Sequence, residues 1–134
     1  MVILDTNAIL RYLLRDIESQ SDAAAEAIRK GACTTTEVIA EAVSVLSHVY
    51  KAPRDEVSWM IHCTLLDVRT ENLKALRYAL GLFNQTNLDF VDCILVAYHK
   101  VLGMDIMSFD RKLNSALEKA FPIHQVEIPQ ELPR

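Results

Sequence analysis

The sequence has few of the residues that break or cross-link a chain, and each shortage excludes a class of protein. Only three of the 134 residues are glycine, so turns are few and helices are expected to dominate. Three cysteines (Cys33, Cys63 and Cys93) lie far apart with no Cys-x-x-Cys spacing, which argues against a disulfide framework and against a zinc site. No stretch approaches the ~20 apolar residues of a membrane helix. The chemistry must therefore rest on other side chains.

Length and composition predict one globular domain. The chain is 51% hydrophobic and 24% charged, which is ordinary for a folded domain. The first residues reach Asp5 without a basic start, so no signal peptide is expected, and a cytoplasmic location is the simplest prediction. We expect a single domain over residues 1–126, followed by a loose tail over residues 127–134 that contains two prolines.

The balance of charge is acidic, with a net charge of −4. This argues against a protein that coats nucleic acid, because such binding needs Lys and Arg side chains to neutralise phosphates. It does not argue against a nuclease. Carboxylates that hold a metal ion add negative charge, and the ion then supplies the positive field that a phosphate meets.

Short apolar runs alternate with helical segments along the chain. This order predicts an α/β fold with a mainly parallel sheet. In such folds the sites form beyond the carboxyl ends of the strands, which would place Asp5 and Asp110 at one edge. The predicted strands cover residues 1–4, 32–35, 65–68, 104–108 and 123–126, and the predicted helices cover residues 8–14, 19–30, 37–50, 54–64, 71–85, 90–102 and 111–120.

Two further acids occupy unusual positions on predicted helices. Glu41 falls at the border of the apolar arc of its helix, beside Val45. Asp92 lies on a narrow polar strip of a helix that is otherwise almost entirely apolar. A buried carboxylate is costly unless it has a partner or takes up a proton. A divalent cation is one candidate partner for Asp92.

Oxygen-rich clusters of this kind suit Mg²⁺, which prefers carboxylates and water as ligands. Such an ion lowers the pKa of a bound water and stabilises both oxygens of a phosphodiester displacement. Simpler interpretations remain open for each acid. Asp5 and Asp110 can cap the helices that follow them, Glu41 can pair with a Lys or Arg, and Asp92 can accept a hydrogen bond from Ser or Thr.

Four segments resemble the PIN-domain ribonucleases, and within them the VapC-like toxins of toxin–antitoxin pairs. The segments are VILDTNAILRYLL, TTTEVIAEAVSVLSHVY, LDFVDCILVAYHKVLG and DIMSFDRKL, and they run from residue 2 to about residue 113. The four acids of the family correspond here to Asp5, Glu41, Asp92 and Asp110. One departure is Ser108, which stands where the family usually has Thr.

The resemblance implies a PIN-like, Rossmann-like three-layer fold with a short, mainly parallel sheet flanked by helices. It also implies Mg²⁺ or Mn²⁺ held by Asp5, Glu41, Asp92 and Asp110, and hydrolysis of RNA by an activated water. Asn7 and Ser108 would support the carboxylates by hydrogen bonds. The roles of Glu37 and Asp89 stay open.

Partners are also implied by the resemblance: an RNA substrate, a second copy in a homodimer, and an antitoxin protein that inserts a segment near the site. Trp59 and Met60 are candidates for protein contacts, although Trp59 can equally complete the core. Basic residues either flank an RNA groove or are ordinary solvated charges; they are Arg11, Arg15, Lys51, Arg54, Arg111 and Lys112. The alternative function is a non-catalytic PIN-like module that binds RNA or protein.

Overall fold

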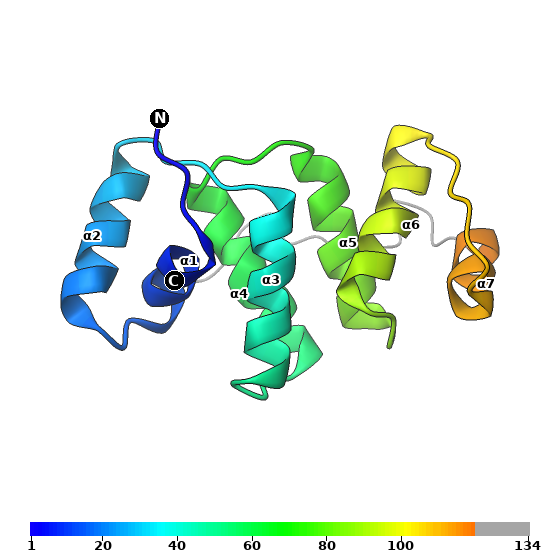
Figure 1. Cartoon of the computed structure of the whole chain (residues 1–134), viewed down its shortest axis with the longest axis horizontal. Helices are drawn as coiled ribbons and strands as arrows, with labels where there is room; N and C mark the ends of the chain where they lie inside the picture. Colours follow the sequence, from blue (N-terminus) through cyan, green and yellow to red (C-terminus); the bar gives the residue numbers. More distant parts are fainter. Residues whose placement is uncertain (120–134) are drawn as a thin grey trace. The chain divides into compact units, whose positions relative to one another are not determined.

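Helices form most of the computed structural model, which describes residues 1–119 (Figure 1). The chain divides into two compact units, Met1–Glu71 (unit 1) and Asn72–Arg134 (unit 2). The predicted strand at residues 123–126 and the predicted tail at residues 127–134 lie outside the described residues. Within residues 1–119, no helix is both long enough and apolar enough to cross a bilayer.

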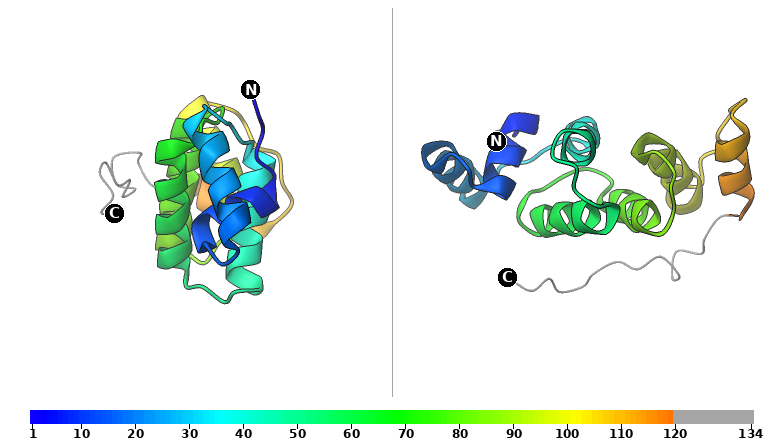
Figure 2. Two further views of the ribbon diagram at one scale, coloured as in Figure 1. Left: turned by 90° about the vertical axis from the view of Figure 1, so that its left-hand side faces the viewer. Right: turned by 90° about the horizontal axis from the view of Figure 1, so that it is seen from below.

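Unit 1 contains four helices: α1 (Thr6–Leu14), α2 (Glu18–Arg29), α3 (Thr36–His48) and α4 (Arg54–Asp67). Helix α1 packs against the other three, and α3 also packs against α4 (Figures 1 and 2). Helix α3 begins where the Thr35 hydroxyl accepts a hydrogen bond of 3.2 Å from the Val38 N–H. Its buried residues recur at helical spacing, so one face enters the core: Ile39, Ala42, Val43 and Leu46.

Unit 2 contains α5 (Leu73–Gln85), α6 (Phe90–Leu102) and α7 (Arg111–Lys119). Helices α5 and α6 lie side by side, and α7 packs against α6 (Figure 1). The Tyr78 side chain is fully buried. Burial, and to a smaller extent the charge of Cys93, raises the pKa of Tyr78 to about 12. Helix α6 ends at Gly103, whose φ of 69° is the left-handed conformation that glycine adopts without strain.

The predicted sheet is wrong for the described part of the chain. Residues 1–119 contain no strand, and only two isolated parallel bridges occur, Ile3 with Cys33 and Cys33 with Arg69. The Leu4 N–H donates to the Cys33 carbonyl at 2.8 Å, yet the pairing extends no further as a ladder. The first run is also not buried on both faces, because Ile3 is 61% exposed. The three-layer α/β fold is therefore corrected to a helical arrangement.

Two other predicted strands have different outcomes with a common cause. Residues 65–67 continue α4 as helix, and residues 104–108 are an irregular segment in which Met107 is 87% exposed. A short apolar run fits a strand and a buried helix equally well, so periodicity alone does not separate the two. The seven predicted helices are confirmed, with ends that differ by a few residues. The single domain over residues 1–126 stays a prediction.

Candidate active site

Asp5 is held at the start of α1. Its backbone is extended (φ −81°, ψ 179°), and its Oδ1 accepts a hydrogen bond of 2.9 Å from the Ala8 N–H. This is the helix-capping role that the sequence left open as an alternative. The side chain is exposed, and Oδ1 is the oxygen that takes the capping bond. A cap and a metal ligand are compatible, because a carboxylate accepts several bonds.

Glu41 lies on the middle of α3, and a residue next to Asp5 contacts it. The Thr6 hydroxyl donates a hydrogen bond of 2.9 Å to Glu41 Oε2. The packing of α1 against α3 brings these two residues together across 35 positions of sequence. Glu41 is exposed, while Ala42 beside it is fully buried. Within unit 1 the structure thus connects the start of α1 to the second candidate acid.

Asp92 lies in the first turn of α6 and is partly buried. Burial raises the pKa of the Asp92 carboxyl, the charges of Asp110 and then Asp89 raise it further, and the Lys112 ammonium lowers it. Two carboxylates of unit 2 thus act on Asp92, opposed by one basic side chain. The sequence singled out Asp92 as the acid in need of a partner, and its raised pKa has the same physical basis.

Asp110 precedes α7 and caps it. Its Oδ1 accepts hydrogen bonds from the backbone N–H groups of Lys112 (2.8 Å) and Leu113 (3.1 Å). The Asp110 N–H in turn donates to the Ser108 hydroxyl at 3.0 Å. Ser108 therefore holds the backbone of Asp110, and its support of a carboxylate or a water stays a prediction. Its carbonyl also accepts a bond of 2.8 Å from the Asn114 side chain.

The loop before α6 is tied to the start of α7 by one further contact. Lys112 Nζ donates a hydrogen bond of 3.2 Å to the Asn87 carbonyl. This contact holds the ammonium near the acids of unit 2. The remaining expected residues, Asn7, Glu37 and Asp89, are exposed in or just before the first turns of α1, α3 and α6.

The acids of unit 2 fit a hard divalent cation in part. A cation would stabilise the charged form of Asp92, whose pKa neighbouring carboxylates raise, and Mg²⁺ binds through one or two carboxylates while it keeps several waters. Among residues 1–119, however, no group of three or more His, Cys, Asp or Glu side chains is arranged to hold a metal ion. The described acids therefore form no complete set of protein ligands, and water would have to supply the remaining ligands of a bound cation.

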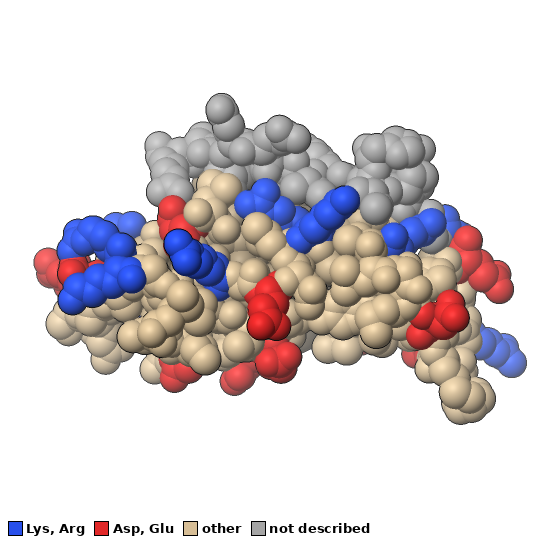
Figure 3. Space-filling view, turned by 90° about the horizontal axis from the view of Figure 1, so that it is seen from above, with Lys and Arg blue, Asp and Glu red and all other residues tan. Residues whose placement is uncertain are grey.

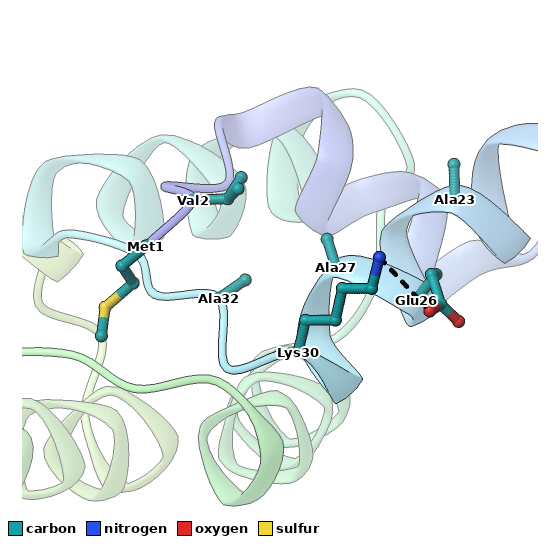
Figure 4. A pocket seen from close by; sticks show the side chains of 7 residues that line it. All are labelled: Met1, Val2, Ala23, Glu26, Ala27, Lys30 and Ala32. Carbon is teal, nitrogen blue, oxygen red and sulfur yellow. Dashed lines mark ion pairs between the residues drawn. The ribbon is translucent and has the colours of Figure 1, made fainter.

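Two cavities lie away from all four candidate acids. In unit 1, a cavity of about 420 Å³ lies beside α2, with Lys30 Nζ 3.8 Å from a Glu26 carboxylate oxygen at its wall (Figure 4). In unit 2, an open cavity of about 610 Å³ involves His99 and Asp105. The first is lined by Met1, Val2, Ala23, Glu26, Ala27, Lys30 and Ala32, and the second by His99, Asp105, Ile106, Asn114, Leu117 and Glu118.

The surface carries both signs of charge. On the face drawn in Figure 3, Lys and Arg side chains lie among Asp and Glu side chains. Several cations are already engaged: Arg11 pairs with Asp16 at 2.8 Å, and Arg29 pairs with Glu26. Trp59 is 42% exposed on α4, so it does not complete the core of the described residues. The prediction that Trp59 contacts a protein partner stays a prediction.

Two contacts of the candidate site were not foreseen from the sequence. The sequence assigns Thr6 no role in the site, and its bond to Glu41 depends on the packing of α1 against α3. Asn114 had no assigned role, although it binds the Ser108 carbonyl. A polar residue at the first position of a helix is the only local signal for Thr6. Its partner cannot be derived from local pattern.

Carboxylates paired near a hard-cation site are typical of metal-dependent hydrolases that act on phosphodiesters. The chain matches the family model of the PIN domain over residues 2–118, and it belongs to the PIN domain family. No curated protein and no solved structure matches it. PIN domains are typically nuclease modules that use divalent metals, and PIN nucleases bind RNA, so a general nuclease role is supported.

Proposed function

We propose that the protein is a Mg²⁺- or Mn²⁺-dependent endoribonuclease. The observation that carries the proposal is the partly buried Asp92 carboxylate, whose pKa is raised by burial and by the charges of Asp110 and Asp89. A folded chain that keeps such an arrangement bears an electrostatic cost, which a bound cation would remove. Membership of the PIN domain family supplies the reaction class.

In this proposal, the candidate metal ligands are Asp5 and Glu41 in unit 1 and Asp92 and Asp110 in unit 2, and each would bind a cation directly or through water. When bound, the cation lowers the pKa of a water ligand and stabilises the negative charge that develops on the phosphate. Asp92 and Asp110 would orient the attacking water, which gives up a proton to solvent as its oxygen bonds to phosphorus. The bond from phosphorus to the leaving oxygen breaks, and that oxygen takes a proton from solvent. Lys112, held by the Asn87 carbonyl, is placed to contact a phosphate oxygen.

The finer proposal is that this nuclease is the toxin of a toxin–antitoxin pair, acts in the cytoplasm and forms a homodimer. Its support is the resemblance of the four acid-bearing segments to VapC-like toxins. Trp59, 42% exposed on α4, is the side chain that we assign to contacts with an antitoxin or a second copy. These assignments go beyond membership of the PIN domain family.

The test is cleavage of a mixed RNA substrate by purified wild type, Asp92→Asn and Asp105→Asn, each with Mg²⁺, Mn²⁺ or EDTA. Asp105 is the matched control because it is exposed in the same unit and does not act on the pKa of Asp92. We expect wild type and Asp105→Asn to cleave RNA only with metal. Loss of a metal ligand should lower the rate by about 100-fold or more in Asp92→Asn.

Each contrary result has a defined meaning. Cleavage that survives Asp92→Asn would reject Asp92 as a ligand. A folded wild type that binds RNA without cutting it in either metal would favour the non-catalytic binding module. A parallel digestion of single-stranded DNA separates a ribonuclease from a nuclease that accepts both polymers.

A further inference from the structure

The contact between Thr6 and Glu41 is a long-range polar contact made by a candidate acid of unit 1. Thr6 Oγ1 donates to Glu41 Oε2 at 2.9 Å. Among residues 1–119, no Lys, Arg or His lies within ion-pair distance of the Glu41 carboxylate. A neutral hydroxyl, and not a cation, therefore holds this side chain. No ion pair among the described residues therefore competes with a ligand for this carboxylate.

The position of Thr6 makes the contact specific. It is the first residue of α1 and follows Asp5 directly, so the backbone turn that fixes Asp5 also fixes the donor to Glu41. Threonine is β-branched and has few side-chain conformations, which makes its hydroxyl a well-defined donor. An exposed glutamate otherwise samples many rotamers, and ordering them opposes ligand binding. The hydrogen bond removes part of that freedom in advance.

The geometry also leaves oxygens for a ligand. At Glu41 the bond uses Oε2, and at Asp5 the capping bond uses Oδ1. Each carboxylate therefore has a second oxygen outside these bonds. Both acids also lie at the positive end of the α1 dipole, which favours a pair of negative charges there.

We propose that Thr6 is a positioning residue, whose hydroxyl holds the Glu41 carboxylate beside the start of α1 so that Glu41 and Asp5 meet a divalent cation in a preset geometry. The inference rests on the proposed function. It assigns Thr6 a role that differs from capping, because the cap of α1 is provided by Asp5. The role also differs from a purely structural link between α1 and α3. Loss of a positioning residue weakens metal binding, whereas loss of a structural link alone does not.

The experiment measures Mn²⁺ binding to the full chain by electron paramagnetic resonance, without substrate. The variants are Thr6→Val, which removes the hydroxyl at similar shape, and Thr6→Ser, which keeps it. Thr70→Val is the matched control, because the Thr70 hydroxyl bonds only a backbone carbonyl, that of Glu71, at 3.5 Å. We expect Thr6→Val to weaken Mn²⁺ binding by about tenfold, as is usual when a residue that orients a ligand is lost. Thr6→Ser should restore most of the affinity, and Thr70→Val should not change it.

A double-mutant cycle separates positioning from a general structural effect. In a Glu41→Gln background, Thr6→Val should weaken Mn²⁺ binding no further, because the charged partner is gone. Thermal unfolding in EDTA shows whether Thr6→Val alters stability without metal. Wild-type Mn²⁺ affinity in Thr6→Val would overturn the inference, and so would an equal loss of affinity with and without Glu41.

Failure of the positioning role of Thr6 can be told apart from failure of the ribonuclease proposal. If Thr6→Val weakens Mn²⁺ binding but the wild type cleaves no RNA, the positioning role stands and the ribonuclease proposal fails. If the wild type cleaves RNA with metal and Thr6→Val binds Mn²⁺ normally, the reverse holds. A wild type that binds no Mn²⁺ overturns the inference and the metal-dependent reaction together.

Discussion

The two candidate acids of unit 1 are held in the opposite way to Asp92 of unit 2. In unit 1, Asp5 and Glu41 are exposed, and each accepts a hydrogen bond from a neutral donor, a backbone N–H and the Thr6 hydroxyl respectively. In unit 2, Asp92 is partly buried, and the charge of Asp110 raises its pKa after burial has done so. Hydrogen bonds stabilise the charged form of a carboxylate, whereas burial and like charge destabilise it.

This difference indicates where the free energy of metal binding would come from. The acids of unit 1 are already oriented, so a cation would gain little by relieving strain there. Asp92 of unit 2 carries an electrostatic cost in the absence of a cation, so binding would remove that cost. Asp92 should therefore contribute more to metal affinity than Asp5 or Glu41.

The largest expected effect is the stabilisation of the folded chain by Mn²⁺. A ligand at 100 times its Kd stabilises a protein by about 2.7 kcal/mol, and the wild type should show a shift of this size in thermal unfolding. Asp92→Asn should lose most of the shift, and Asp5→Asn should lose less of it. Calorimetry with and without EDTA measures both.

Asp105→Asn is the control here too, and it should keep the wild-type shift because Asp105 does not act on the pKa of Asp92. A larger loss in Asp5→Asn than in Asp92→Asn would reverse the comparison between the units. It would place the dominant metal ligands at the start of α1.

The next largest effect is the dependence of stability on alkaline pH that the buried Tyr78 gives to unit 2. Unit 2 buries Tyr78 completely, and its pKa is raised to about 12, above the ordinary value of about 10. Because the pKa of Tyr78 is higher in the folded chain than in the unfolded chain, the protonated tyrosine contributes to the free energy of unfolding. This contribution is complete below pH ~10 and is lost as the pH rises toward about 12. The loss should be on the order of 2 kcal/mol in urea unfolding. Tyr78→Phe should remove this alkaline dependence.

Tyr98→Phe is the matched control, since Tyr98 lies on α6 in the same unit and is only partly buried. It should keep the alkaline loss of stability. Equal alkaline loss in wild type and Tyr78→Phe would show that other groups cause it. The core of unit 2 would then be no more sensitive to high pH than that of unit 1.

The features that the sequence predicts correctly are those that depend on residues close together in the chain. The helices were predicted well because their signals are local: a Thr35 cap, a Gly103 terminus and apolar residues at helical spacing. The sheet was not, because strand pairing joins distant segments, and the described bridges at Cys33 are single contacts. Local pattern in short apolar runs does not decide whether such contacts grow into a ladder.

The same distinction applies to the candidate site. The capping bonds of Asp5 and Asp110 were available from sequence because both acids precede helices. The isolation of Asp92 among apolar neighbours also signalled its raised pKa. The bond from Thr6 to Glu41 was not available, since it arises from how α1 packs on α3. The metal-ligand roles of all four acids stay predictions.

The smallest effect is also the most direct test of the comparison, because the two units should respond with opposite sign. Asp5→Ala removes the cap of α1 and should destabilise the chain by about 1 kcal/mol in EDTA at neutral pH. Asp92→Asn should stabilise it under the same conditions, by less than about 1 kcal/mol, because it removes a repelled charge from a partly buried position.

The pH dependence checks the cause of that opposite sign. Since the folded-state pKa of Asp92 lies above the ordinary value, its contribution to stability is complete below the ordinary pKa of an aspartate and is lost as the pH rises through the raised pKa. The gain in Asp92→Asn should therefore grow over that window and then level off. Urea unfolding from pH 3 to pH 8 would record it, as a series of about six points. The difference in free energy of unfolding between wild type and Asp92→Asn could instead stay constant across this range. That result would show that packing, and not the charge of Asp110 and Asp89, sets the stability of the first turn of α6.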